Sequence, residues 1–403
     1  MTNMFGAETK KAKNNFNFSG QPFSLKLAKN IALIKLASAE ANADLKVLDK
    51  KIAQAITISC RQILNGEHTD QFVVDQFQGG AGTSMNMNVN EVVAGLAENL
   101  LKNNIKVHPL DHVNRSQSTN DVVPSAAKIT TLQLLDDLEK ELENYSKITK
   151  DKAQQFKNIK KSGRTHLQDA VPMTLGQEFS AHVTAIGKDI ARLKKTHTNL
   201  CELNLGGTAI GTEINCPKSF RQLVIKKLAV ATEYPLRSAS DLIYSTQYCD
   251  PFLEVGATLT ILSSNLIKFL NDLRLLASGP NTGLNEISFA SVQSGSTIMP
   301  GKINPVMAEA LTQICFQTIG NYQTMLLSAQ AGQLELNVML PIMYRNLFES
   351  LELITNGVRQ FAKLGMSTIT ANKENCEGWL DKNITARKTT LINQIGFDEA
   401  LKK

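Results

Sequence analysis

Apolar residues recur at steps of three and four along five long stretches of the chain, which is the spacing of one face of an α-helix and not of a strand. In the first stretch the stripe runs from Ile129 to Ile148, inside a run of residues (125–162) without Gly or Pro. A helix through that run would be roughly 50 Å long. The other stripes occupy residues 175–193, 259–276, 305–330 and 347–361. The pattern predicts an all-α fold built on a long-helix bundle.

The order of the stripes predicts three consecutive parts. Residues 1–105 are expected to form a small N-terminal helical domain, residues 106–364 a central five-helix bundle, and residues 365–403 a shortened C-terminal segment. The sequence Ser278-Gly279-Pro280 is expected to end the third bundle helix, because Gly and Pro interrupt helical hydrogen bonding. Helical bundles host many unrelated activities, so the chemistry has to be sought in the loops.

The composition narrows the class of protein. Hydrophobic residues make up 42% of the 403 residues and charged residues 20%, a balance typical of a folded globular chain and not of a disordered one. No uninterrupted apolar run approaches the roughly 20 residues of a membrane span, and the first residues lack the apolar core of a secretion signal. We therefore expect no membrane partner.

Charge and cysteine content restrict the partners further. The net charge of +6 comes from scattered lysines and aromatic residues are only 6%, so no nucleic-acid partner is expected, and a small anionic substrate fits better. The six cysteines include no CxxC pair, and the histidines lack zinc spacing. We expect no metal site, and free thiols in a reducing, cytoplasmic compartment.

Two polar segments are rich in hydroxyl and amide groups. Residues 78–90 are rich in Gly, hydroxyl and amide groups, which suits close approach of the backbone to a ligand, although an ordinary polar loop has the same composition. In residues 108–121, the donors Ser118, Thr119 and Asn120 stand together at the expected start of the first long helix. Helix starts attract anions, but a simple N-cap uses the same residue types.

Two further segments carry residue types that catalysis uses. Residues 293–305 contain two possible hinge glycines, a hydroxyl pair, a cation and an amide: Gly295, Ser296, Thr297, Gly301, Lys302 and Asn304. A substrate lid needs such groups, and a flexible connector is the alternative. His166, within residues 163–169, is a candidate general acid or base, but a lone histidine is also common as a structural residue.

These segments resemble the aspartase/fumarase superfamily over nearly the whole chain. Residues 295–304 read Gly-Ser-Thr-Ile-Met-Pro-Gly-Lys-Ile-Asn, which is similar to the signature loop Gly-Ser-Ser-x-Met-Pro-x-Lys-x-Asn. Three other segments look more like aspartases than fumarases: Gly80-Ala-Gly-Thr-Ser-Met-Asn86, Gln117-Ser-Thr-Asn120 and Gly332-Gln-Leu-Glu-Leu-Asn-Val-Met339.

The resemblance implies a carbon–nitrogen lyase that performs the reversible anti elimination of ammonia from L-aspartate to give fumarate. Loss of the proton next to the β-carboxylate creates an aci-carboxylate with two negative charges, so preorganised donors around that group are the main catalytic lever. The alternatives are fumarate hydratase, which interconverts L-malate and fumarate, and a catalytically impaired structural homologue.

The resemblance also implies roles for individual residues. Ser296 is the expected base and has to act as an alkoxide in a closed, dry loop. The matching donors are Thr83, Ser118, Thr119 and Thr297 for the β-carboxylate, Lys302, Asn304 and Thr165 for the α-carboxylate, and Asn120 and His166 for the amino group. Glu309 has a supporting role, and Gly295 and Gly301 are hinge candidates.

The remaining implications concern cofactors, assembly and departures from the family pattern. No nicotinamide, flavin or metal cofactor is implied, and the sequence has no GxGxxG fingerprint. The expected partners are a dicarboxylate or amino-acid substrate and three further copies of the chain, in a homotetramer whose active sites each draw on three subunits. Both ends look short for the family, and Glu213, Asn281 and Leu340 stand where Gly, Arg and Glu are usual. A position that needs φ above zero would strain Glu213.

Overall fold

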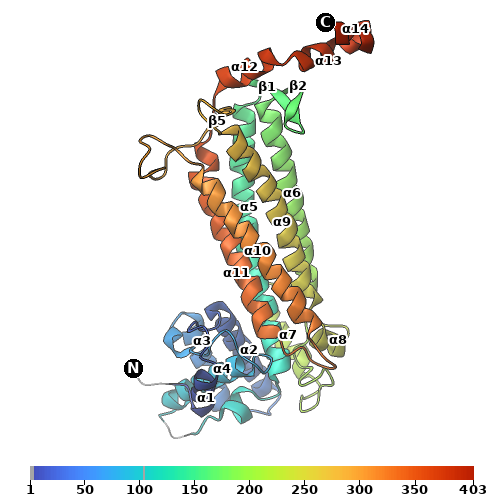
Figure 1. The fold of residues 1–403 in the computed structure, drawn as a ribbon. Helices are drawn as coiled ribbons and strands as arrows, with labels where there is room; N and C mark the ends of the chain where they lie inside the picture. Colours follow the sequence, from blue (N-terminus) through green and yellow to red (C-terminus); the bar gives the residue numbers. More distant parts are fainter. Residues whose placement is uncertain (1–3, 103–104) are drawn as a thin grey trace. The chain divides into compact units, whose positions relative to one another are not determined.

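The computed structural model describes residues 4–102 and 105–403, and helices carry most of them (Figure 1). The N-terminal helices are α1 (Ala7–Asn15), α2 (Leu25–Asp44), α3 (Lys50–Leu64) and α4 (Thr83–Leu100). The long helices are α5 (Thr119–Gln155), α6 (Leu175–Leu200), α9 (Asp250–Leu276), α10 (Val306–Gln330) and α11 (Leu340–Leu364). The all-α bundle predicted from the sequence is confirmed, and each of the five stripes lies on one of these long helices.

Shorter elements lie between these helices or follow α11. They are the 3₁₀ turns η1 (Thr69–Gln71) and η3 (Met366–Thr368), the π-helical turn η2 (Pro109–Val113), and the helices α7 (Phe220–Thr232), α8 (Leu242–Gln247), α12 (Lys373–Lys382), α13 (Ile384–Ile395) and α14 (Phe397–Lys402). The described residues also form two-stranded ladders: antiparallel β1 (Lys160–Thr165) and β2 (Gln168–Thr174), parallel β3 (Glu202–Leu203) and β4 (Arg237–Ser238), and antiparallel β5 (Ile287–Ser288) and β6 (Thr370–Ala371).

The chain forms two compact units, and each long helix contributes to both. Unit 1 comprises Met1–Asp136, Lys195–Ala257 and Gly320–Leu351, and unit 2 comprises Asp137–Lys194, Thr258–Ile319 and Glu352–Lys403. This division runs across the helices, whereas the predicted parts are consecutive in sequence, so the three-part division stays a prediction. Its first boundary adjoins residues 103–104, which lie outside the described residues.

Aromatic side chains fill the core of unit 2. His182 of α6 stacks on Phe269 of α9 with ring centroids 3.7 Å apart, and its Nε2 lies 2.8 Å from Tyr145 Oη of α5. Tyr145 in turn packs edge-on against Phe361 of α11, with centroids 5.9 Å apart. Burial lowers the pKa of His182 to about 3, so this imidazole is neutral and shares one hydrogen bond with the tyrosine hydroxyl.

A close helix–helix contact also contributes to the packing of the bundle within unit 2. Gly357 of α11 lets α10 approach closely, because a Cβ at this position would lie 2.8 Å from Ile314 Cδ1.

By length and composition alone, α9 could span a membrane. In this structure its residues Leu262, Leu266 and Leu270 are buried, as in the core helix of a bundle.

The sequence prediction was wrong after the first long helix. The run 125–162 was expected to be helical, but α5 ends at Gln155 and Lys160 begins β1. The strand escaped notice because β1 reads Lys-Lys-Ser-Gly-Arg-Thr and has no apolar side chain, so it lacks the alternation of apolar and polar residues by which a strand is recognised. One of its buried positions holds Lys161, which is 2% exposed and ion-paired with Glu178 and Glu286.

Replacement of Tyr145 by Phe tests the polar contact in this core. Tyr145→Phe leaves the buried His182 Nε2 without its partner, so we expect the free energy of unfolding to fall by about 1–3 kcal/mol in urea titrations. Tyr248→Phe is the control, since Tyr248 is 62% exposed, and this change should leave stability nearly unchanged. Equal effects of the two substitutions would show that the Tyr145–His182 contact contributes nothing.

Candidate active site

Within unit 1, the structure joins the first two predicted segments. Thr83 begins α4 and Thr119 begins α5. Asn86 lies one turn after Thr83 on α4, is 2% exposed, and donates from Nδ2 to Thr119 Oγ1 at 3.1 Å and to Asn114 Oδ1 at 3.1 Å. Residues three apart share a helix face. Asn86 therefore fixes the start of α5 against the helix face that carries Thr83.

The three consecutive donors at the start of α5 have different local roles. Ser118 acts as a cap, since its Oγ accepts from Asn120 N at 3.3 Å. Asn120 donates from Nδ2 to the Ala209 carbonyl at 2.8 Å. Thr119 Oγ1 accepts from Asn86, and a hydroxyl that accepts still has its own proton to donate. Both hydroxyl oxygens thus accept, and Ser118 and Thr119 each keep a proton to donate to a ligand.

A side chain from outside the helix supports the first turn of α5. Pro124 lies in this helix and has no N–H, so the Asn120 carbonyl four residues earlier lacks its helical donor. Asn204 Nδ2 donates to that carbonyl at 3.0 Å, and Asn204 is fully buried. The backbone beneath Ser118, Thr119 and Asn120 therefore depends on an amide far away in sequence.

Two buried charges lie behind the same segment. Lys35 of α2 is 0% exposed and donates from Nζ to Asn114 Oδ1 at 2.7 Å and to Gln117 Oε1 at 3.0 Å. Asp121 is also 0% exposed and accepts from the backbone N–H of Ser118 at 2.9 Å. Burial lowers the pKa of Lys35 to about 7 and raises that of Asp121 to about 6, while their mutual attraction opposes both shifts.

The loop that follows β3 completes this part of the site. Gly206 N and Thr208 N donate to Asp121 Oδ2 at 2.9 and 3.0 Å. Thr208 Oγ1 is buried and has no hydrogen-bond partner among the described residues. Glu213 has φ of 60°, so the strain foreseen for this position is present, and its Oε1 lies 3.2 Å from Arg221 Nε.

In unit 2, Thr165 and His166 lie at the tip of the β1–β2 hairpin. Thr165 pairs with Gln168, so His166 and Leu167 form a two-residue turn. Both turn residues have positive φ, 55° and 60°, a conformation usually left to Asn and Gly. Thr165 and His166 are exposed. A strained, exposed histidine at a hairpin tip is suited to contact a ligand.

Ser296 lies in the loop between β5 and α10, which Figure 1 draws as an excursion from the bundle of unit 2. Its Oγ accepts from the backbone N–H of Met299 at 3.0 Å and of Ile298 at 3.2 Å. Asn304 Nδ2 donates to the Gly295 carbonyl at 2.7 Å and so joins the two ends of the loop. The two N–H groups are donors of the kind that an alkoxide at Ser296 requires.

The two glycines of this loop differ in the space around them, and its polar side chains differ in exposure. A Cβ at Gly295 would lie 1.9 Å from the Lys302 carbonyl oxygen, so this position needs close backbone approach, while Gly301 has φ of 76° in open space. Thr297 and Lys302 are exposed, and Glu309, on the first turn of α10, is half-buried. The neighbouring Ile298 is 85% exposed.

The structure therefore groups the predicted residues into three sets. Thr83 and Ser118–Asn120 belong together in unit 1 through Asn86. In unit 2, one set is Thr165 and His166, and the other is the loop that holds Ser296 and Asn304. The supporting residues Lys35, Asn86, Asp121, Asn204 and Thr208 were not predicted from the sequence, and the amide-rich segment 86–90 was a signal for Asn86 alone.

This fold, with its polar segments at helix starts, is that of the lyases in the aspartase/fumarase superfamily, which confirms the resemblance seen in the sequence. The chain belongs to the lyase family, whose model matches residues 1–320. It is 45% identical to the aspartate ammonia-lyase of Bacillus subtilis (strain 168) over 401 residues, which cover 98% of this chain and 84% of that relative.

Solved structures show the same fold. One is a fumarate lyase:delta crystallin from Brucella melitensis bound to cobalt, with a TM-score of 0.96 and 38% identity. Another is the class II fumarase from Schistosoma mansoni, with a TM-score of 0.96 and 33% identity. Each match covers 100% of this chain and 88% of the other.

The buried Lys35 predicts a dependence of stability on pH. Between about pH 7 and 10 the folded protein has released the Lys35 proton, whereas the unfolded chain, with its ordinary pKa near 10.5, still holds it. Stability therefore rises with pH in this window, and Lys35→Met removes a slope of up to about 1.4 kcal/mol per pH unit. Chemical denaturation at several pH values measures it. The exposed Lys140→Met is the control and should follow the wild type; parallel curves for Lys35→Met would refute the assignment.

Proposed function

We propose that the protein catalyses the reversible anti elimination of ammonia from L-aspartate to give fumarate, as a carbon–nitrogen lyase. The observation that carries the proposal is that the Ser296 hydroxyl oxygen accepts hydrogen bonds from the backbone N–H groups of Ile298 and Met299. The loop that holds Ser296 matches the family signature. Its support from relatives is the 45% identity to an aspartate ammonia-lyase. The substrate is a small dicarboxylic amino acid.

In the first step, the Ser296 alkoxide removes a proton from the carbon next to the β-carboxylate. The electron pair of that C–H bond moves into the carboxylate and produces the aci-carboxylate dianion. Hydroxyl donors stabilise this charge without having to change protonation state. Ser118, Thr119 and Thr297 take this role, and Thr119 is well suited since Asn86 already occupies its acceptor side. Thr83 takes it as well once its hydroxyl, which donates to the Gly80 carbonyl at 2.8 Å in this structure, turns to the substrate.

In the second step, the dianion expels the amino group. The Cα–N bond breaks, its electron pair leaves with the nitrogen as ammonia, and the C=C bond of fumarate forms. Lys302, Asn304 and Thr165 hold the α-carboxylate, while Asn120 and His166 hold the departing amine and Glu309 supports them. The neutral Ser296 hydroxyl then returns its proton to solvent, which restores the alkoxide.

The class II fumarase with the same fold supports a second candidate, fumarate hydratase acting on L-malate. The two reactions share the aci-carboxylate and differ in the leaving group. We favour ammonia because the helix-start segment reads Gln117-Ser-Thr-Asn120, as in the aspartase pattern. A cytoplasmic location belongs to the same proposal, and the six free cysteines fit a reducing compartment.

Fumarate absorbance in the ultraviolet tests the proposal directly. We expect the purified protein to form fumarate from L-aspartate and not from L-malate, and Ser296→Ala to lower kcat by about 10²–10⁴-fold. Ser294→Ala is the matched control, since Ser294 is an exposed serine of the same loop. Turnover of L-malate alone would transfer the assignment to fumarate hydratase, and a folded protein that converts neither would be the impaired homologue.

The active form is proposed to be a homotetramer in which three subunits supply each site. Its support is the set of apolar side chains left exposed on bundle helices of unit 2, Ile261 at 43%, Leu275 at 41% and Phe316 at 58%, which an interface between copies would bury. Light scattering should give a mass about four times 44.2 kDa. Phe316→Glu should shift the protein to smaller species and abolish turnover; an active monomer would contradict the shared site.

A further inference from the structure

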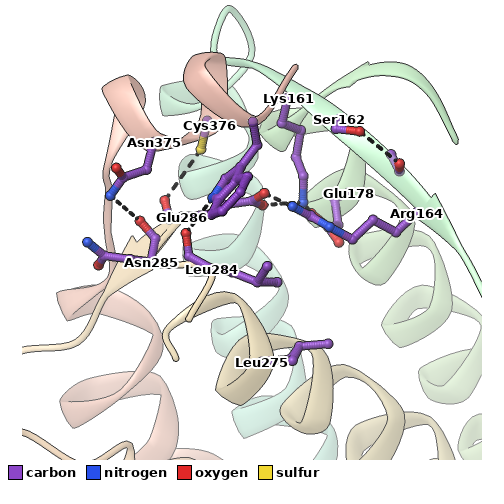
Figure 2. A network of polar contacts seen from close by, with 12 residues as sticks. Lys161, Ser162, Arg164, Glu178, Leu275, Leu284, Asn285, Glu286, Asn375 and Cys376 are labelled. Carbon is purple, nitrogen blue, oxygen red and sulfur yellow. Dashed lines mark hydrogen bonds and ion pairs between the residues drawn. The ribbon is translucent and has the colours of Figure 1, made fainter. Parts of the chain in front are cut away.

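A fully buried carboxylate stands between two cations in unit 2 (Figure 2). Glu286 is 0% exposed, and its two oxygens have different partners: Oε1 lies 2.7 Å from Arg164 Nη1 and Oε2 lies 2.7 Å from Lys161 Nζ. Lys161 Nζ also lies 2.7 Å from Glu178 Oε2 of α6. The cluster thus holds two cations and two anions, and each charge has at least one partner.

The cluster joins two elements that the mechanism needs. Lys161 and Arg164 both lie on β1, and Arg164 directly precedes Thr165 and His166. Glu286 directly precedes β5, the strand from which the chain enters the loop of Ser296. One carboxylate therefore connects the stem of the hairpin to the stem of the catalytic loop, and Glu178 connects the hairpin to α6 through Lys161.

The segment from Asn372 to Asn383 holds the same two stems through side chains. Trp379 Nε1 donates to the Leu284 carbonyl at 2.8 Å, Asn375 Nδ2 donates to the Asn285 carbonyl at 2.9 Å, and Cys376 Sγ lies 3.5 Å from the Glu286 carbonyl. On the hairpin, Asn383 Nδ2 donates to Ser162 Oγ at 2.6 Å and to the Ala170 carbonyl at 2.8 Å.

Buried ion pairs cost desolvation energy and contribute little net stability, so their common use is to define one geometry. We propose that Glu286 is a positioning residue: its ion pairs with Lys161 and Arg164, closed over by the segment Asn372–Asn383, set the geometry of the His166 hairpin and the stem of the Ser296 loop. The inference deepens the proposed function. Glu286 acts through Thr165, His166 and Ser296 and not on the substrate itself.

Glu286→Gln tests the proposal, because it keeps the shape of the side chain and removes its charge. We expect hydrogen–deuterium exchange to accelerate by about 10-fold or more in both residues 160–174 and residues 284–305, since the two stems lose one shared anchor. The emission of Trp379, the only tryptophan of the chain, should shift to longer wavelength as its contact with Leu284 loosens. The kcat/KM for L-aspartate should fall by about 10–100-fold.

The matched control is Asp189→Asn. Asp189 is a buried carboxylate in the same unit, 2% exposed, which pairs with Arg192 and accepts from Asn265 of α9. The Asp189→Asn variant should lose about as much thermal stability as Glu286→Gln does. Its Trp379 emission, the hydrogen–deuterium exchange of both stems and kcat/KM should stay near wild-type values. The positioning role would be overturned if Glu286→Gln accelerated hydrogen–deuterium exchange in one stem only, or if Glu286→Gln and Asp189→Asn accelerated it equally.

The test also covers two unfavourable cases, a Glu286→Gln variant that does not fold and a wild-type protein without activity. If Glu286→Gln does not fold, Arg164→Met removes one cation and leaves Glu286 paired with Lys161, and the same joint rise in exchange is expected. If the wild-type protein converts neither L-aspartate nor L-malate, the proposed function has failed. The exchange and emission measurements then still decide whether Glu286 couples the two stems.

Discussion

The first turn of an α-helix has backbone N–H groups without partners inside the helix, and the part of the candidate site in unit 1 is organised around this constraint. Thr83 and Thr119 begin α4 and α5, the hairpin of His166 leads into α6, and the loop of Ser296 leads into α10. Helix starts carry partial positive charge and favour anions. The segments of Thr83 and of Ser118–Asn120 therefore stand where the helix backbone offers donors to a carboxylate, whereas His166 at its hairpin tip and Ser296 in its loop lie ahead of α6 and α10.

Each compact unit supports its site segments with buried charge. In unit 1, Lys35 and Asp121 lie behind the start of α5, and in unit 2, Lys161 and Glu286 lie behind the hairpin and the loop. Such groups are expensive to bury, so they are found where a fixed geometry is worth the loss of stability. The hydroxyl groups expected to contact substrate are exposed or half-buried, whereas the groups that position them are inside.

This separation explains what the sequence could and could not predict. Apolar periodicity located the five long helices, and Gly- and hydroxyl-rich composition together with the family signature located the site segments. Strand β1 was missed because its sequence has no apolar side chain, and its buried Lys161 depends on the remote Glu178 and Glu286. Asn86, Asn204 and Lys35 escaped for a related reason: a buried polar residue is recognised by its partners, and those partners are remote in sequence. The roles of the individual site residues stay predictions.

The break in the hydrogen bonding of α5 has an evolutionary consequence. Pro124 leaves the Asn120 carbonyl open and Asn204 fills it. Asn204 also donates to Thr246 Oγ1 at 3.1 Å and accepts from Ser125 Oγ at 3.3 Å. A lineage that replaced Pro124 by a residue with an N–H would restore the helical bond and leave Asn204 with these two partners. A lineage that lost Asn204 first would carry an unpaired carbonyl at the start of α5. Proline at position 124 is therefore expected among homologues only together with a donor at position 204, whereas Asn204 can occur without the proline.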